Sequence, residues 1–373
     1  MKLVVERSAL MTALTHANSV VERRSTIPVL ANVRLDADEQ NLRLTATDMD
    51  LEVVQNVAAD VTAPGTTTAS AFLLQNICRT LPDGAQVALD RDQTSGRLSI
   101  HCGPTQFEFA CLPPEDFPLM TATAFSHGFS LPAAELRRLL DRTHFAALVE
   151  GARENLQGVF FHATTGDGSL VLRAVATDGH RLARVDTEQP EGADGMPGII
   201  VPNKTIHVLR SLIDTADEDI DIEVAERKLS FRSGAIQMTS KLIDGTYPNY
   251  EKVIPDDNDR VMRVSKDTFV RATDRMSVIT TTDKGRPVKL DISTGRLQVS
   301  ASNLEGVTGE EELEVDYEGP SMTIGFNARY ISEMAKNFDG DVMLVIMSRD
   351  SSPAIVRDAD DSRTLYVLMP LRV

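Results

Sequence analysis

Hydrophobic and polar positions along the chain form the same pattern three times. A short strand with alternating apolar residues leads each time into an amphipathic helix, in which apolar residues lie three and four apart. The three segments are LVVERSALMTALTHAN from Leu3, FSLPAAELRRLLDRTH from Phe129 and MRVSKDTFVRATDRMSV from Met262. Ser8, Pro132 and Ser265 suit a helix start. The pattern predicts three related units.

Three further landmarks follow in the same order in every unit. The first is a strand that enters a polar turn and a second strand, at LRLTATDMDLEV, LVLRAVATDGHRLARV and LQVSASNLEGVTGEEEL. The second is a strand that enters another helix, and the third is a closing strand such as TLYVLMPLRV. The resulting helix predictions are 7–18, 70–81, 132–144, 202–213, 265–278 and 326–338. Strands are predicted between them at 220–224, 229–232, 288–292 and 342–346.

The predicted fold class is α+β, with three similar domains built of antiparallel sheets. Each domain is expected to hold about eight strands and two helices in roughly 120 residues. The domains are predicted at 1–123, 127–254 and 258–373. A simpler alternative is that the three copies arose by duplication and serve no shared geometric purpose.

The composition is that of an ordinary globular protein. Of the 373 residues, 42% are apolar and 25% are charged, which excludes a largely disordered or coiled-coil chain. No run approaches the roughly 18 apolar residues of a membrane span, and the N-terminus lacks the order of a signal peptide. We therefore expect a soluble, cytoplasmic protein. Cys78, Cys102 and Cys111 show no C-x-x-C spacing, which favours reduced core thiols over a disulfide or zinc site.

The charge is distributed unevenly along the sequence. The chain carries a formal charge of −17, yet its six predicted helices contain more basic than acidic residues. Duplex DNA attracts such a basic face through counterion release without any base being read. The alternative is that these are ordinary solvated helix exteriors. The basic residues predicted to face DNA are Arg7, Arg79, Arg137, Arg138, Arg142, Lys204, Arg210, Lys266, Arg271, Arg275, Arg329 and Lys336.

Catalytic chemistry has one candidate, the segment Asp178-Gly179-His180, where a carboxylate and an imidazole lie two residues apart. A hydrolase or metal enzyme using Asp178 and His180 is therefore one hypothesis. No second His or Cys cluster stands at ligand spacing, and the chain has no P-loop, G-x-G-x-x-G or G-x-S-x-G motif. The favoured interpretation is a structural turn with an exposed recognition surface, without catalytic residues, metal or cofactor.

Four motifs resemble a known family over the whole chain. ATDGHRLA at 176–183, SKLIDGTYPNY at 240–250, GFN at 325–327 and VLMPLR at 367–372 look like the bacterial DNA sliding clamp, the beta subunit of DNA polymerase III. The resemblance implies a non-catalytic processivity factor: a head-to-tail homodimeric ring around double-stranded DNA. It also implies partners that carry a short clamp-binding motif, including polymerase subunits and the clamp loader, and no membrane. A competing hypothesis is a repeat scaffold that binds peptides without encircling DNA.

The resemblance also implies roles for particular residues. The dimer contact would involve Phe107 and Phe109 against Val278 and Ile279, which could instead be ordinary core positions. Arg24 and Arg153 are the loop residues best suited to contact DNA. The partner-peptide pocket would be lined by Leu156, Thr177, Gly179, His180, Arg181, Leu182, Pro248, Val253, Asn327, Tyr330, Ser352, Val367, Met369, Pro370, Leu371 and Arg372.

Overall fold

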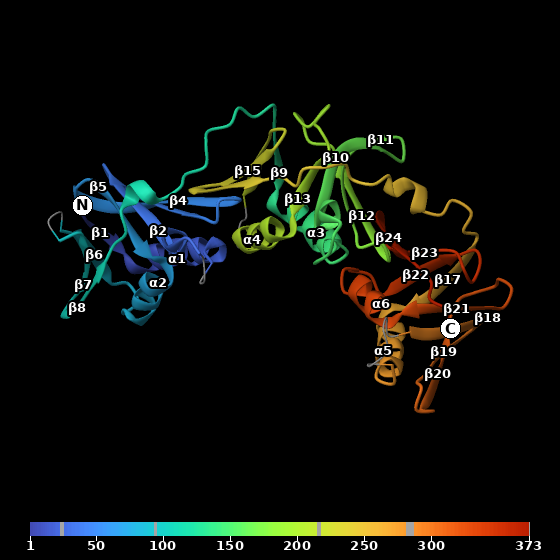
Figure 1. The fold of residues 1–373 in the computed structure, drawn as a ribbon. Helices are drawn as coiled ribbons and strands as arrows, with labels where there is room; N and C mark the ends of the chain where they lie inside the picture. The colour runs from blue at the N-terminus through green and yellow to red at the C-terminus, as the bar shows by residue number, and fades with distance from the viewer. Residues whose placement is uncertain (23–25, 93–94, 215–217, 281–286, 373) are drawn as a thin grey trace. The chain divides into compact units, whose positions relative to one another are not determined.

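The computed structural model describes residues 1–22, 26–92, 95–214, 218–280 and 287–372 (Figure 1). Its α-helices agree with the six predicted windows to within a few residues. They are α1 (Arg7–Val20), α2 (Ala71–Thr80), α3 (Ala133–His144), α4 (Asn203–Ile213), α5 (Lys266–Ser277) and α6 (Ala328–Ala335).

The described ranges contain twenty-four strands, eight in each predicted copy. The first copy holds β1 (Lys2–Glu6), β2 (Asn32–Asp38), β3 (Asn41–Thr47), β4 (Leu51–Ala63), β5 (Gly65–Ser70), β6 (Gln86–Arg91), β7 (Arg97–Cys102) and β8 (Thr105–Ala110). The second holds β9 (His127–Pro132), β10 (Gly158–Gly166), β11 (Ser169–Thr177), β12 (Arg181–Glu188), β13 (Ile199–Pro202), β14 (Asp219–Val224), β15 (Lys228–Ser233) and β16 (Ile236–Lys241). The third holds β17 (Arg260–Ser265), β18 (Pro287–Ser293), β19 (Arg296–Ser302), β20 (Thr308–Glu314), β21 (Met322–Asn327), β22 (Val342–Met347), β23 (Ala354–Asp358) and β24 (Asp361–Leu368). The prediction of three α+β copies is confirmed.

Strand order repeats with the copies. The first copy contains the antiparallel sets β5-β2-β3-β4 and β8-β7-β6-β1. The second repeats them as β13-β10-β11-β12 and β16-β15-β14-β9, and the third as β21-β18-β19-β20 and β24-β23-β22-β17. The fourth strand of one copy then pairs with the last strand of the next, as β4 with β16 and β12 with β24. Backbone hydrogen bonds therefore run without a break from one copy into the next.

Two compact units contain these sheets. The first comprises residues 1–137, 190–196 and 204–242 and holds a twelve-stranded sheet. The second comprises 138–189, 197–203 and 243–373 and holds an eight-stranded and a four-stranded sheet. Strand β4 is long enough to serve two neighbours in the first unit, since 51–55 pair with β16 and 59–63 with β1.

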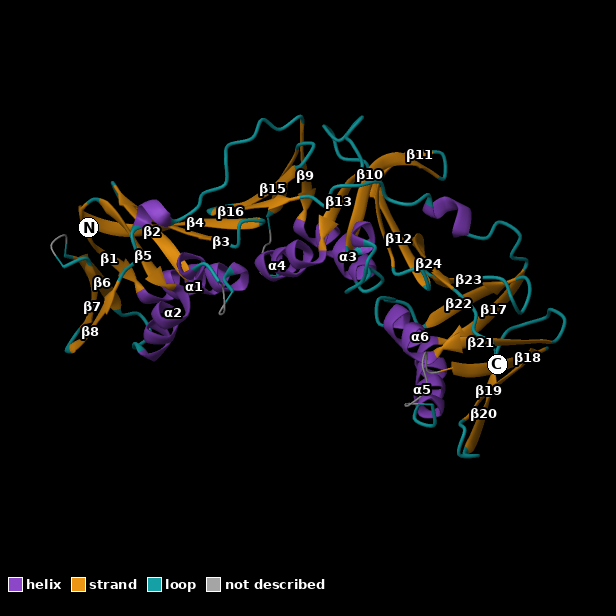
Figure 2. Cartoon of the chain, in the orientation of Figure 1, coloured by secondary structure: helices purple, strands orange, loops and turns teal. Residues whose placement is uncertain are grey.

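Paired helices cover sheet faces at both ends of the chain. Helix α1 packs against β3, β4 and α2, and α5 packs against β18, β19, β20 and α6 (Figure 2). Leu10 and Leu14 of α1 are completely buried, as their spacing of four predicts for one helix face. The first helix begins one residue before Ser8, and Glu6 caps it instead, because its carboxylate accepts a hydrogen bond from the Ala9 N–H at 2.9 Å.

All three cysteines are free thiols in the structure. Cys78 and Cys102 are buried as expected, but Cys111 is only half-buried. Burial raises the pKa of the Cys78 thiol to about 11, so the thiol stays protonated at neutral pH.

Candidate peptide-binding and DNA-facing surfaces

Four residues from four strands of the second unit form one row across its eight-stranded sheet. Thr177 on β11 lies opposite Leu182 on β12, Leu182 lies opposite Val367 on β24, and Val367 lies opposite Ile355 on β23. Directly paired residues of antiparallel strands project from the same face of a sheet. The β12–β24 pairing therefore brings together residues of the predicted peptide pocket that are separated by 185 positions.

An apolar cluster surrounds this row. Leu156, Leu182 and Val367 are buried in it together with Tyr247, Tyr250 and aliphatic residues of the neighbouring strands. These side chains form the base of the predicted site and leave little of themselves accessible. Val253, by contrast, exposes 42% of its surface, and Met369 exposes 37%. Exposed apolar area at this place is what a partner could remove from water.

The turn at 178–180 is shaped by its own side chains. The Asp178 carboxylate accepts hydrogen bonds from the N–H groups of His180 at 2.9 Å and Arg181 at 3.1 Å. The Thr177 hydroxyl accepts from the Gly179 N–H at 3.1 Å and donates to the Arg181 carbonyl at 2.6 Å. Gly179 has a φ of +90°, which only glycine adopts readily. The turn leaves the His180 side chain exposed.

The same turn occurs in the other two copies. Asp48 accepts from the N–H groups of Asp50 and Leu51, and Asn303 accepts from those of Glu305 and Val307. The recurring Thr-Asp and Ser-Asn landmark is therefore an Asx turn, which explains the need for Asp or Asn there. In the described part of the chain, no three His, Cys, Asp or Glu residues are grouped as metal ligands.

The chain end closes over this turn. The Met369 N–H donates to the His180 carbonyl at 3.0 Å, and the Leu371 N–H donates to the Gly325 carbonyl at 2.8 Å. Asn327 caps α6, since its side-chain oxygen accepts from the Arg329 N–H at 3.0 Å. These contacts hold the C-terminal residues of the predicted pocket beside the turn. The remaining predicted pocket residues are accessible: Pro248 and Arg372 are exposed, and Tyr330, Ser352, Pro370 and Leu371 are half-buried.

Arg181 turns its guanidinium into the protein and exposes only 7% of its surface. Its Nε donates to Asp178 at 3.1 Å, and its two terminal nitrogens bond to Glu333 and to the Phe145 carbonyl. The guanidinium carbon also lies 4.2 Å from the Tyr330 ring centroid, a cation–π contact. Arg181 thus holds the turn and α6 together. Sequence reasoning missed Phe145 and Glu333, because neither belongs to a motif.

The helices place many of their basic side chains beside carboxylates or carbonyls. Arg7 donates to the Cys78 carbonyl, Lys204 pairs with Glu22 and Asp48, and Arg275 pairs with Glu311. The other engaged side chains are those of Arg137 with the Ile213 carbonyl, Arg138 with the Asp186 carbonyl, Lys266 with the Phe338 carbonyl, Arg271 with Asp267 and Arg329 with Glu333. Arg210 is half-buried, whereas Arg79 and Lys336 are exposed.

Arg142 corrects one expectation. It was predicted to face DNA, but it is 7% exposed and its guanidinium pairs with Asp361 and Asp339 and donates to the Thr364 hydroxyl. A guanidinium that is both buried and paired with two carboxylates is not available to a phosphate. Arg24 lies outside the described residues. Arg153 is exposed and lies at the 178–180 turn, where it donates to the Asp178 carbonyl at 3.3 Å.

The predicted dimer residues are not core residues. Phe107 exposes 36% of its surface and Val278 exposes 68%, while Phe109 and Ile279 are half-buried. Strand β8, which carries both phenylalanines, is the last strand at one edge of its sheet. The alternative that all four are ordinary core positions is therefore wrong.

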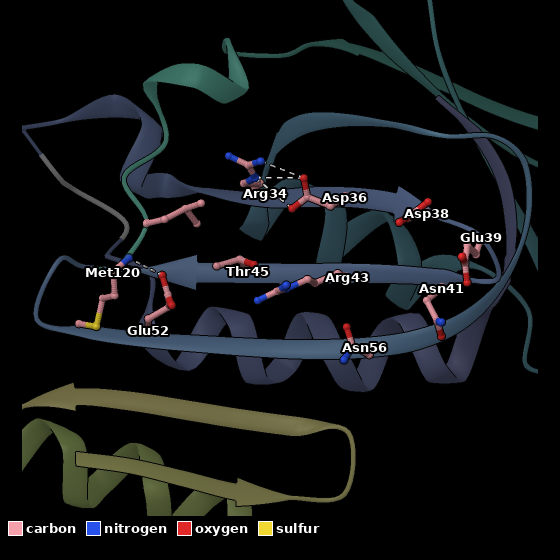
Figure 3. A pocket seen from close by; sticks show the side chains of 11 residues that line it. Arg34, Asp36, Asp38, Glu39, Asn41, Arg43, Thr45, Glu52, Asn56 and Met120 are labelled. Atoms are coloured by element: carbon pink, nitrogen blue, oxygen red, sulfur yellow. Dashed lines mark hydrogen bonds and ion pairs between the residues drawn. The ribbon is translucent and has the colours of Figure 1, made fainter. Parts of the chain in front are cut away.

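Two hollows lie elsewhere on the described surface. One, of about 480 Å³, opens on the polar face of β2, β3 and β4 beside Met120 (Figure 3). There Arg34 pairs with Asp36, and Glu52 accepts the Met120 N–H at 3.0 Å. Burial raises the pKa of this Glu52 carboxyl. The second hollow, of about 560 Å³, lies between the third copy's β18–β20 and Arg372.

Fold and site together define the class: three repeated α+β copies whose sheets are joined by strand pairing, with an exposed Asx turn beside accessible apolar side chains. Family comparison is consistent with this class in all three copies. The N-terminal, central and C-terminal domain models of the DNA polymerase III beta subunit match residues 1–121, 130–249 and 251–372. The chain therefore belongs to the DNA polymerase III beta subunit family.

Relatives match from end to end. The beta sliding clamp of Caulobacter vibrioides is 43% identical over 373 residues, with both chains fully covered. A sliding clamp structure from Bartonella birtlesii bound to griselimycin is 42% identical, with full coverage of both chains and a TM-score of 0.96. A griselimycin-bound sliding clamp from Pseudomonas aeruginosa is 34% identical, with full coverage and a TM-score of 0.94.

Family membership decides between the functional hypotheses. Members are non-catalytic accessory subunits of the polymerase, so the chain is a processivity factor and not a hydrolase. The scaffold that binds peptides without DNA is not favoured. Across the described residues, no helix is both long and apolar enough to cross a lipid bilayer.

Proposed function

We propose that two copies of this chain close head to tail into a ring around duplex DNA. The observation that carries this proposal is the repeated strand pairing. Within the chain, β16 pairs with β4 and β24 pairs with β12. The equivalent strands β8 and β20 are both edge strands of the described sheets. A second copy supplies the missing partner for each, and a symmetric pair then has no free equivalent edge.

Side-chain chemistry at the two edges supports this pairing. Strand β8 presents the exposed Phe107 and the half-buried Phe109, and Val278 and Ile279 follow α5, which packs on β20. Pairing β8 with β20 of the other copy removes these apolar surfaces from water. The three domains that the ring repeats are proposed at 1–123, 127–254 and 258–373, and the assembly works in the bacterial cytoplasm.

Duplex DNA passes through the ring without recognition of its base sequence. The candidate phosphate contacts are exposed helical side chains such as Arg79 and Lys336, since weak and equivalent contacts allow sliding. The further candidates are Arg7, Arg137, Arg138, Lys204, Arg210, Lys266, Arg271, Arg275 and Arg329, with Arg24 and Arg153 from loops. Enclosure retains the protein on DNA while a tethered polymerase stays at high local concentration.

Partner proteins bind through a short peptide motif at the surface built around the row from Thr177 to Ile355. Such a ligand can contact the exposed apolar side chains of Val253 and Met369 and the accessible His180. The flexible thioether of Met369 can adapt to different peptides. Polymerase subunits and the clamp loader are the proposed partners. We also propose that griselimycin, which the Bartonella birtlesii clamp binds, occupies this surface and serves as a probe for it.

A topological experiment tests the ring. The protein is loaded onto nicked circular DNA, and the circle is then cut with a restriction enzyme. Retention on the circle with rapid release after linearisation is expected. Equal loss from circular and linear DNA would refute encirclement.

A separate experiment tests whether griselimycin binds at the proposed peptide site. His180→Ala is expected to weaken griselimycin binding by about tenfold or more, as truncating a central contact residue does. Lys241→Ala, an exposed residue of the first unit, is the control. Unchanged affinity in His180→Ala would place griselimycin elsewhere.

A further inference from the structure

A polar row, buried at Arg173 and Asp186 and half-buried at His162, lies on the same sheet face as the peptide site. His162 on β10 is directly opposite Arg173 on β11, and Arg173 is directly opposite Asp186 on β12. On β11, Arg173 lies four residues before Thr177 of the peptide-site row. On β12, Asp186 lies four residues after Leu182 of that row. An even spacing along a strand keeps side chains on one face, so both rows share it.

The row is a complete hydrogen-bonded group. Arg173 and Asp186 form a two-pronged ion pair, with Nε to Oδ1 at 2.7 Å and the second nitrogen to Oδ2 at 2.8 Å. Their side chains are only 5% and 11% exposed. Gly166 leaves the space they need, since a Cβ there would stand 3.0 Å from both groups. Such paired, planar contacts fix the guanidinium in one orientation.

This group holds a segment from another part of the chain. The third guanidinium nitrogen of Arg173 donates to the Tyr250 hydroxyl at 3.3 Å, and that hydroxyl lies 3.0 Å from Nε2 of His162. Burial, with help from Arg173, lowers the pKa of His162, so a neutral imidazole can accept a hydrogen bond from the Tyr250 hydroxyl. Arg173 also lies 3.7 Å from the Glu251 carboxylate.

Residues 247–253 are therefore anchored at two points. The Tyr247 ring stacks on Phe160 at a centroid distance of 4.7 Å and an interplanar angle of 4°. The Tyr250 hydroxyl is fixed by the polar row. Between and beyond these anchors lie Pro248 and Val253, which belong to the proposed peptide site.

We infer that Arg173, Asp186 and His162 are positioning residues for partner binding, which act through Tyr250 on the segment 247–253. This inference rests on the proposed peptide site. Without the hydroxyl contact, the segment keeps its apolar packing but samples more positions, so Pro248 and Val253 are no longer held ready for a ligand. Preorganisation of this kind contributes to affinity without any contact to the ligand.

Tyr250→Phe is the decisive variant, because it keeps the buried ring and removes only the hydroxyl. We expect griselimycin affinity to fall by about fivefold, the equivalent of one hydrogen bond. The control is Tyr317→Phe, which removes a hydroxyl that donates to the Pro320 carbonyl at 2.7 Å, outside the peptide site. The control is expected to keep full affinity.

A spectroscopic reporter separates positioning from general stability. The chain has no tryptophan, so Lys252→Trp at an exposed position supplies a single fluorophore within the segment. In that background, Tyr250→Phe should increase acrylamide quenching and lower the fluorescence anisotropy, whereas Tyr317→Phe should change neither. This measurement needs no ligand.

The outcomes are distinguishable. Unchanged quenching and affinity in Tyr250→Phe, or equal changes in Tyr317→Phe, would overturn the positioning role. If His180→Ala keeps full griselimycin affinity, griselimycin binds elsewhere and the proposed peptide site fails its test, and the fluorescence reporter still decides whether the polar row fixes the segment. If His180→Ala loses affinity while Tyr250→Phe loses none, only the positioning role fails.

Discussion

Replacing Phe107 with alanine should weaken dimerisation while leaving the fold of each protomer intact. Phe107 exposes 36% of its surface on the edge strand β8. A phenylalanine offers about 200 Å² for burial, so about 70 Å² is left for a second copy to cover. At 25 cal/mol per Å² this area contributes about 1.75 kcal/mol. Two symmetric contacts give about 3.5 kcal/mol, which raises the dimer dissociation constant by roughly three hundredfold.

Sedimentation velocity over a concentration series measures this change directly. Leu73→Ala is the matched control, because Leu73 exposes a similar 43% of its surface but lies on α2, away from the strand edge. The control should keep the dimer dissociation constant within about twofold, as expected for a surface substitution away from the interface. An unchanged dimer in Phe107→Ala, or an equal loss in Leu73→Ala, would show that β8 is not the contact.

Four further predictions concern buried and exposed charges. Arg142→Met should cost about 3–5 kcal/mol in urea unfolding, because it strands the Asp361 carboxylate, which is 16% exposed. Asp339→Asn should cost about 1 kcal/mol or less, because that carboxylate is 92% exposed. Burial alone would raise the pKa of Asp361, but hydrogen bonds from Thr364 and the backbone outweigh it and lower the pKa below its ordinary value of 3.8. The stability that the ionised Asp361 contributes is therefore present above about pH 4 and is lost as pH falls through the lowered pKa. Asp361→Asn should accordingly make the free energy of unfolding, measured with urea, less dependent on pH below about pH 4. Arg79→Gln should reduce the salt slope of duplex binding by about 0.9 for each phosphate that the side chain no longer neutralises, and Arg142→Met should leave the slope unchanged. An altered slope in Arg142→Met, or stability equal to wild type, would contradict the burial of this side chain.

The local pattern of apolar and polar residues was sufficient to predict the helices, the strands and the recurring turns. The helix from Ala71 to Thr80 and the strand from Val342 to Met347 match their predicted windows, because apolar spacing reports directly which face of an element is buried. The recurring Thr-Asp and Ser-Asn landmark was also readable, since an Asx turn is made within a few residues. Its atoms therefore lie together whatever the rest of the chain does.

The sequence pattern could not show which basic side chains are exposed and which are enclosed by carboxylates. Arg142 and Arg79 are both basic residues on amphipathic helices, yet one is enclosed by two carboxylates and the other is exposed. The carboxylates that enclose Arg142 come from positions about two hundred residues later in the chain. Helical spacing contains no information about partners so distant.

The amino-acid sequence by itself determined three copies, their α+β elements, the acidic balance and the family motifs, because these depend on spacing between near neighbours. Only the tertiary structure decided which strands carry one copy's sheet into the next, and that β8 and β20 lack the partner their equivalents have. It alone placed Tyr250 against Arg173 and buried Arg142. Each of these depends on backbone pairing or ion pairing across long separations, which is set by the packing of the whole fold.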